Sequence, residues 1–444
     1  MAKKKKRKVN KQKVFSFVSL IFIVICILWY GGRFIYFYLD NKKTDAKEAN
    51  IFAKVLLSKN KDDLKQVKEE YYFYGNTQSN YVMYSNILWR VVKINKDNTV
   101  RLISENVMGT LNNGTDDYDT SSVITWLNKV KEKSYSGVME SVLSNQDSFL
   151  VKSNICTDVI DDVNKMTCDK VNDHYDIGLL SIEDYLYTGG NKGFIHNGKV
   201  TYLANQNKKK NYWYITSEGK LDSDSENEII GIRPVITIAS VMEAKDGDGS
   251  KDKPYTFSEE KNYHASYVKL GSDIWRVYES DEEKLKLILD TTLVDEDGEA
   301  FKYLYAKKNY QYNDTVYGTL AYYLNKTYYN HLDYGSIIVE NNYANGVYGE
   351  DNHYSLEEIS KETISTKVAL PSLHDIIVND EVDGYDTLTG VSGNDSYVYV
   401  RNQNGAIGQK SISYENKVRP CISIMKESLK AGSGTSTDPY RLGE

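Results

Sequence analysis

The apolar positions near the N-terminus form one nearly continuous stretch. Residues 14–30 carry no charged side chain, and residues 34–39 add a second apolar run after a short Gly-Gly-Arg interruption. Together they reach the ~20 apolar residues that are needed to cross about 30 Å of hydrocarbon. The pattern predicts a single transmembrane helix over residues 14–39, in contact with the lipid bilayer.

The charge around this stretch predicts its orientation. Eight basic side chains lie within residues 1–13, and an excess of Lys and Arg marks the cytoplasmic side of a span. We therefore expect residues 1–13 to be a cytoplasmic tail and the rest of the chain to be extracellular. A nuclear-localisation signal would explain the basic run but not the apolar stretch. A cleaved signal peptide would need small residues where residues 27–30 are bulky, so an uncleaved signal anchor is favoured.

Residues 40–70 are rich in Lys, Asp and Glu and have only a thin apolar pattern. Phe52, Val55 and Leu56 have the i, i+3, i+4 spacing of one helical face. We interpret the segment as a short helical stalk, with a solvated linker that is partly helical as the alternative.

After residue 70, short apolar runs alternate with polar turns, which is typical of β-hairpins. One hairpin is predicted over residues 80–103 and another over residues 266–288. The two sequences match at an offset of 186, which aligns Trp89-Arg90 with Trp275-Arg276. Further segments repeat in the same order: a short helix (residues 121–129 and 318–326), a strand followed by a capping serine (177–184 and 368–375), and an aromatic strand (212–216 and 397–400).

Each repeat closes with the same signature. An Arg-Pro pair opens an apolar strand, and a Pro-Tyr pair ends an exit turn of the form G-x-G-[ST]-x-x-x-P-Y. Four of the five prolines lie in these pairs, which are Arg233-Pro234, Pro254-Tyr255, Arg419-Pro420 and Pro439-Tyr440. Because a repeat of about 186 residues is much longer than a solenoid unit, two whole domains are predicted, over residues 71–255 and 263–440.

Composition favours β-rich domains of the mixed α+β class. The 444 residues suit two or three domains, and 38 Tyr stand against 11 Phe and 5 Trp. Tyrosine favours strands. The net charge of -7 includes the basic tail, so the remainder is more acidic still, which argues against nucleic acid as a partner.

The repeated order of a Trp-Arg-Val hairpin, an aromatic-Leu-Asn helix, an aromatic strand and an Arg-Pro strand resembles an extracellular domain family of Gram-positive bacterial surface proteins, whose members are uncharacterised. That family is related to the formylglycine-generating-enzyme and C-type-lectin-like fold, and its domains often follow a membrane anchor. The resemblance covers residues 71–255 and 263–440 and implies two tandem lectin-like domains at the cell surface. The second copy departs from the first in having Tyr323 for Trp126.

The cysteines leave one pairing to consider outside the membrane. Cys156 and Cys168 bracket a polar loop that the second copy lacks. We expect a disulfide there, because an extracellular location permits one, with a reactive thiol pair as the alternative. Cys26 falls in the predicted span, and Cys421 replaces Val235 in a closing strand, where it is expected to be a small buried hydrophobe.

No cofactor, metal ligand or catalytic residue is predicted. The six histidines are scattered without metal-ligand spacing, and the acidic turns at residues 246–249 and 295–298 lack the twelve-residue calcium-loop pattern. The tripeptides with which lectin-like domains bind calcium and sugar are missing, as are the common phosphate-binding and nucleophile motifs.

Two sets of residues are candidates for binding. Arg233 and Arg419 could clamp an anion with a bidentate fork, although a buried structural role beside a carboxylate of the same domain is favoured. Aromatic residues of the two aromatic strands could form a ligand face, since aromatics anchor interfaces; the alternative is that half of them pack inward. These residues are Tyr212, Trp213, Tyr397 and Tyr399.

These patterns predict a non-enzymatic, single-pass surface protein that displays two lectin-like domains to bind an extracellular glycan or protein. One alternative is an oxidase of the formylglycine-generating type, which would need a cysteine or metal constellation in a cleft. Another is a structural or sensory ectodomain. With only 13 residues before the span, its output would require a membrane partner.

Overall fold

The computed structural model describes residues 50–114, 116–129, 137–165, 167–223, 229–259, 262–349, 355–378, 380–402 and 405–443. Strands outweigh helices, at 36% against 18%, which confirms a sheet-rich α+β class. Within these ranges no helix is long and apolar enough to cross a bilayer. The predicted span, residues 14–39, and the basic tail, residues 1–13, lie outside them.

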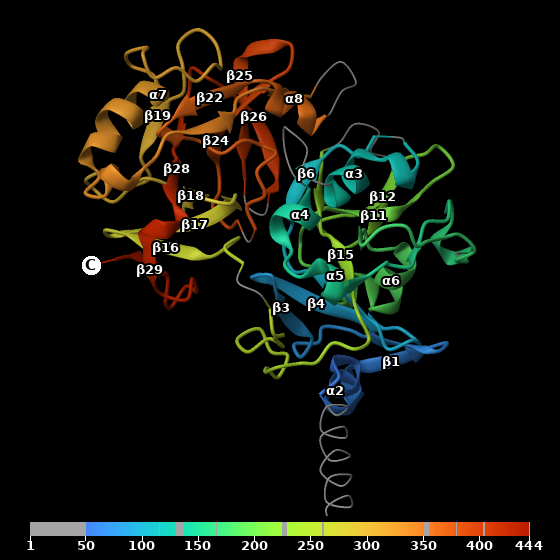
Figure 1. The fold of residues 1–444 in the computed structure, drawn as a ribbon. Coiled ribbons are helices and arrows are strands. Elements are labelled where there is room, and N and C mark those ends of the chain that lie inside the picture. Colours follow the sequence, from blue (N-terminus) through green and yellow to red (C-terminus); the bar gives the residue numbers. More distant parts are fainter. Residues whose placement is uncertain are drawn as a thin grey trace, which may run out of the picture.

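The first copy contains an eight-stranded sheet (Figure 1). Six strands follow the order β1-β2-β4-β5-β15-β10, while β3 pairs with β4 and β7 pairs with β15. Their bounds are β1 (Leu64–Val67), β2 (Glu70–Phe73), β3 (Tyr81–Tyr84), β4 (Ile87–Ile94), β5 (Val100–Ser104), β7 (Leu150–Val151), β10 (Ile177–Gly178) and β15 (Val235–Ile238). The central strands are rich in β-branched and aromatic residues, which suits a sheet with a buried face.

A smaller sheet and short helices complete the first copy. The sheet follows the order β13-β12-β11-β14-β6, with bounds β6 (Gly109–Leu111), β11 (Thr201–Gln206), β12 (Tyr212–Ile215), β13 (Leu221–Asp222) and β14 (Ile230–Ile232). A separate pair joins β8 (Ile155–Cys156) to β9 (Val171–Asn172). The helices are α2 (Phe52–Lys59), α3 (Ser122–Asn128), α4 (Val138–Val142), α5 (Gln146–Phe149) and α6 (Ile182–Tyr187). Ser181 caps α6 as predicted, because its hydroxyl accepts the backbone N–H of Asp184 at 3.1 Å. The corresponding prediction for Ser372 in the second copy is wrong, since a turn and not a helix follows it.

The second copy is also built on two sheets. The larger follows the order β23-β28-β18-β17-β16-β30-β29, and the smaller follows β19-β27-β24-β25-β26 with β21 beside β24. Bounds in the larger sheet are β16 (Tyr267–Leu270), β17 (Asp273–Ser280), β18 (Lys284–Leu289), β23 (Val368–Ala369), β28 (Cys421–Met425), β29 (Leu429–Ala431) and β30 (Tyr440–Leu442). Bounds elsewhere are β19 (Lys302–Leu304), β20 (Asn341–Ala344), β21 (Val347–Tyr348), β22 (Thr363–Thr366), β24 (Tyr385–Val391), β25 (Asn394–Arg401), β26 (Ile407–Ser411) and β27 (Glu415–Lys417), with helices α7 (Leu320–Tyr322), η5 (Tyr323–Tyr328) and α8 (Leu356–Lys361).

The two copies repeat one strand order. The series β3-β4-β5-β15-β10 in the first copy corresponds to β16-β17-β18-β28-β23 in the second. Trp89 in β4 and Trp275 in β17 are both fully buried. A bulge interrupts both hairpins at the same place, after Val91 and after Val277. The repeated sequence motifs therefore build a repeated scaffold.

The arginines beside these tryptophans also belong to the scaffold. Arg90 lies 3.5 Å from Glu105, and Arg276 lies 2.6 Å from Asp290. Each guanidinium also stacks on a tyrosine of the neighbouring strand, Tyr81 in the first copy and its counterpart in the second. These contacts are internal to each copy and explain why the Trp-Arg pair recurs.

The segment predicted as a separate stalk is instead part of the first copy over its described residues, 50–70. The predicted helix is present as α2, but its apolar face is buried: Phe52 packs edge-on against Tyr255 and Phe257, with ring centroids 5.5 and 5.1 Å away. The chain then enters the sheet as β1 and pairs with β2. The packing of α2 on the first copy could not be predicted from the sequence, because the partners of Phe52 lie about two hundred residues later in the chain.

The two copies share a buried interface. The hydroxyl of Thr110 in β6 donates to the carbonyl of Gly405, in the turn between β25 and β26. The backbone N–H of Asn112 donates to the Tyr348 hydroxyl at 3.2 Å. Apolar residues of α8, β21 and β25 join the same buried cluster as the core of the first copy. The first copy thus presents β6 and α3 to the second (Figure 1).

His264, at the start of the second copy, is a buried histidine whose burial should make the stability of the protein depend on pH. The side chain is 1% exposed, and burial lowers its pKa to about 4. An unfolded histidine has a pKa of about 6.5, so the folded state disfavours protonation. The free energy of unfolding is therefore unaffected by His264 above about pH 6.5. It falls by up to about 3 kcal/mol as the pH is lowered toward 4.

We expect His264→Gln to remove this dependence. Urea unfolding of the two proteins should diverge progressively between pH 7 and pH 4, with the wild type losing more stability. Parallel curves over that range would show that the pKa of His264 is the same in the folded and unfolded protein.

Candidate functional site

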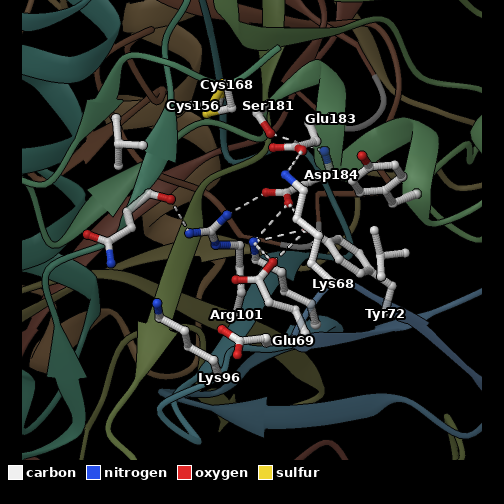
Figure 2. Close-up of a pocket in the computed structure, with 16 residues that line it drawn as sticks. Lys68, Glu69, Tyr72, Lys96, Arg101, Cys156, Cys168, Ser181, Glu183 and Asp184 are labelled. Atoms are coloured by element: carbon white, nitrogen blue, oxygen red, sulfur yellow. Dashed lines mark hydrogen bonds and ion pairs between the residues drawn. A yellow bond between two sulfur atoms is a disulfide. The ribbon is translucent and has the colours of Figure 1, made fainter. Parts of the chain in front are cut away.

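A pocket of about 280 Å³ opens on the first copy, where the β1–β2 hairpin faces the loop that carries Cys156 and Cys168 (Figure 2). The hairpin and the loop have no counterpart in the described part of the second copy, whereas β5 beneath them belongs to the repeated scaffold. The pocket is therefore built where segments peculiar to the first copy meet. Its lining includes Lys68, Glu69, Glu70, Tyr72, Lys93, Lys96, Arg101, Asn154, Ser181, Glu183, Asp184 and Tyr187.

A buried ion pair forms the floor of the pocket. Arg101 of β5 donates to Asp184 of α6 at 2.5 Å, and both side chains are 2% exposed or less. Lys93 lies 3.3 Å from the same carboxylate, and the Tyr72 hydroxyl donates to it at 3.1 Å. Burial alone would raise the pKa of Asp184, but Arg101 and Lys93 outweigh it and lower the pKa to about 2. The floor is thus a fixed charge network that stays ionised at neutral pH.

The rim adds charges that are open to solvent. Lys68 lies 3.8 Å from Glu183, a loose pair, while Lys96 and Glu69 are exposed and form no ion pair among the described residues. Figure 2 shows Lys96 and Glu69 across the pocket from the disulfide. The lining holds four cationic and four anionic side chains, so a ligand meets both signs of charge without a net excess of either.

Cys156 and Cys168 are joined by a disulfide at the edge of the pocket. Asp158 holds the same loop, since its carboxylate accepts the backbone N–H groups of Asp169 and Lys170 at 2.5 and 2.9 Å. Asp158 also lies close to both sulfur atoms. Because the disulfide occupies both thiols, the group offers one carboxylate and no thiolate to a metal ion.

Removing the disulfide should loosen the pocket. The bond closes a loop of 12 residues, and a cross-link of this size contributes about 3 kcal/mol in the chain-entropy model. We expect the Cys156→Ala/Cys168→Ala double variant to lose roughly that much stability, with faster amide exchange confined to β8 and β9. Hydrogen-exchange mass spectrometry measures both; unchanged exchange there would mean that Asp158 alone holds the loop.

The four predicted ligand-face aromatics do not form one face. Tyr212 and Tyr399 are 1% exposed, whereas Tyr397 is 37% exposed. Trp213 is half-buried, and its indole N–H donates to the carbonyl of Ile160 at 2.8 Å. Tyr399 packs edge-on against Tyr348 in the interface between the copies. Burial therefore corrects the prediction for Tyr212 and Tyr399, in line with the alternative that half of the set packs inward.

The two Arg-Pro arginines are both buried inside their copies. Arg419 pairs with Asp380 at 2.5 Å, and each side chain is 1% exposed. Arg233 instead donates to two backbone carbonyls, of Ser104 at 2.8 Å and Ile195 at 2.6 Å. Burial lowers the pKa of Arg233 to about 10, against the opposing effect of Glu105. Neither guanidinium is available to clamp an external anion.

The second copy has counterparts of the residues in the pocket floor, but in its described residues it lacks the hairpin that covers them. Lys286 and Asp375 stand at the positions of Arg101 and Asp184 in the repeat, and Lys286 pairs with Glu279 at 2.8 Å. No hairpin equivalent to β1–β2 covers them in the described part of that copy. Comparison of the chain with protein-family models, curated proteins and solved structures gave no match.

Proposed function

We propose that the protein is a membrane-anchored extracellular binding protein, with two β-rich lectin-like domains, whose ligand site is the pocket of the first copy. One observation carries the proposal: the β1–β2 hairpin and the disulfide loop, which distinguish the first copy from the second, both line this pocket. The N-terminal sequence supports the location, because a basic tail precedes an apolar stretch.

The charges of the pocket define the ligand. Arg101 and Lys93 both pair with the buried Asp184 carboxylate, so a ligand would contact the rim. Lys96 offers a cation to a carboxylate or phosphate, and Glu69 accepts from an amine or hydroxyl. A small polar molecule with groups of both signs, such as an amino acid or the end of a short peptide on a cell-wall glycan, fits this arrangement.

The oxidase alternative gains no support from the described cysteines. Cys421 is buried in β28, and burial raises its pKa well above the ordinary value, which disfavours the nucleophilic thiolate. Cys156 and Cys168 form a disulfide rather than a thiol pair.

Arrays of glycans and peptidoglycan fragments, probed with the full chain in detergent micelles with and without calcium, test the proposal. We expect saturable binding to fragments that carry free carboxyl and amino groups. A hydrogen bond to a charged group contributes about 1.5–3 kcal/mol, so Lys96→Ala and Glu69→Ala should each weaken binding by roughly tenfold or more. The exposed residues Lys251 and Glu296, outside the pocket, supply the matched alanine controls.

Binding that survives both pocket variants would place the site elsewhere. No binding to any fragment by a well-folded protein would favour a structural or sensory ectodomain that works with a membrane partner.

A further inference from the structure

The interface between the two copies joins two different surfaces. The first copy contributes its leading edge, defined as β6 and α3, and the second copy contributes its trailing edge, defined as the β25–β26 hairpin with the elements beside it. Because the copies share one fold, each surface has a counterpart in the other copy. The leading edge of the second copy is β19 with α7 and η5, and the trailing edge of the first copy is the β12–β13 hairpin.

The leading edge of the second copy is open and aromatic. Tyr323 of η5 stacks on Phe301 and Tyr303 beside β19, with ring centroids 4.8 and 4.9 Å away. All three rings are half-buried. Next to them Tyr317 is 78% exposed and packs edge-on against Tyr322. In Figure 1, β19 and α7 lie on the side of the second copy that faces away from the first.

The trailing edge of the first copy is open as well. Tyr399 of β25 is 1% exposed where the second copy meets the first. Its counterpart in the strand register of the repeat, Trp213 of β12, is half-buried. Figure 1 places β12 on the side of the first copy away from the second.

We propose that these two open edges dock on each other between chains, so that the occupant of the aromatic edge at Tyr317 and Tyr323 is a second copy of this chain. Such a contact would continue the interface that already joins the two copies within one chain. Within the chain, the leading edge of the first copy is covered by the trailing edge of the second copy. Exposed aromatic surface of this kind marks interaction sites.

The geometry predicts the form of the assembly. The two edges are different surfaces at opposite sides of the chain, so the contact is heterologous, and each added chain exposes a new edge. Assembly should therefore be open-ended, and it should not stop at a two-fold dimer.

Sedimentation velocity of the full chain in detergent micelles, over a concentration series, tests this. The average mass should rise steadily with concentration. Tyr317→Ser should weaken association by about tenfold or more, as expected for an aromatic anchor at an interface, without altering the fold because the side chain is exposed. Tyr74→Ser, at a tyrosine that is 50% exposed next to β2 of the first copy and outside both edges, is the matched control and should associate as the wild type does.

A mixing experiment distinguishes the head-to-tail contact from other modes. Tyr317→Ser blocks the leading edge, and Trp213→Ser blocks the trailing edge. At a concentration where the wild type associates but a tenfold weaker contact does not form, each variant alone should be monomeric, while an equimolar mixture should form a dimer through the intact edges and grow no further. If Trp213→Ser unfolds, as judged by circular dichroism, the Tyr317→Ser series decides alone.

Three outcomes would overturn the proposal: a monomer at every concentration, a closed dimer that Tyr317→Ser does not affect, and glycan binding that Tyr317→Ser abolishes in a protein that never self-associates. None of them bears on the pocket of the first copy, whose ligand is tested by Lys96 and Glu69.

Discussion

Replacing Arg419 by Met is expected to lower the free energy of unfolding of the second copy by about 3–5 kcal/mol, the usual loss when one partner of a buried ion pair is removed. Arg419 and Asp380 are each 1% exposed and lie 2.5 Å apart. The guanidinium also donates to the carbonyl of Leu289 at 2.7 Å and to the Tyr385 hydroxyl at 3.1 Å. Methionine keeps much of the volume but leaves the Asp380 carboxylate buried without its cation.

Arg233→Met supplies the matched comparison, because the sequence motif is the same and the partner is not. Arg233 donates to the carbonyls of Ser104 and Ile195 and has no ion pair with a carboxylate among the described residues. Losing donors to two carbonyls should cost about 1–3 kcal/mol, and this loss is offset by no longer burying a charge that is poorly compensated.

Urea unfolding of the full chain, combined with hydrogen exchange in β15 and β28, measures both losses. We expect exchange to rise in β28 for Arg419→Met and only slightly in β15 for Arg233→Met. Equal losses at the two sites would show that the shared Arg-Pro motif, and not the ion pair with Asp380, determines how much free energy of unfolding each arginine contributes.

The strand scaffold was predictable because its sequence motifs occur in both copies. The Trp89 and Trp275 hairpins, the Ser181 cap and the sheet-rich class follow from local patterns that recur about 186 residues apart. The roles of the Arg-Pro arginines followed only in part. A carboxylate partner was expected for both, but Arg233 donates to the Ile195 carbonyl with the nitrogen that in Arg419 pairs with Asp380.

The pocket could not be predicted, because its residues are distant in sequence and individually ordinary. Lys68, Arg101, Cys156 and Asp184 come from four separate segments, and none of the four lies in a known ligand-binding motif. A charge inside an apolar strand, as at Arg101, was the one available signal. It indicates a buried partner but does not identify that partner.

The prediction of an exposed ligand face that includes Tyr399 was wrong because its burial also depends on residues that are distant in sequence. Alternation along a strand predicts which side chains face a domain's own core. It says nothing of a second domain that covers the outward side, as happens at Tyr399, where the interface with the first copy removes the ring from solvent.

Gly249→Ala should cost about 4 kcal/mol of stability, because two effects add. The backbone at Gly249 has φ of +84°, a conformation that costs other residues about 1–2 kcal/mol. A methyl group there would also meet the Ser79 carbonyl oxygen and approach the Tyr255 ring to 2.6 Å, and such overpacking costs about 1–3 kcal/mol. The exit turn cannot yield, since the Gly249 carbonyl accepts the backbone N–H of Tyr81 at 2.8 Å.

Gly298→Ala separates the two effects. Gly298 has nearly the same φ, +81°, but nothing lies within 4 Å of the added carbon, so only the backbone strain of about 1–2 kcal/mol should appear. Gly434, in the exit turn of the second copy, has φ of +81° and the Tyr440 ring at 2.5 Å, so its alanine variant should behave as Gly249→Ala does. Unfolding midpoints in urea rank the three. If Gly249→Ala and Gly434→Ala match Gly298→Ala, the repeated glycines serve the turn conformation alone; if both exceed it, the exit turn recurs because only glycine lets the chain pass so close to the Pro-Tyr strand that closes each copy.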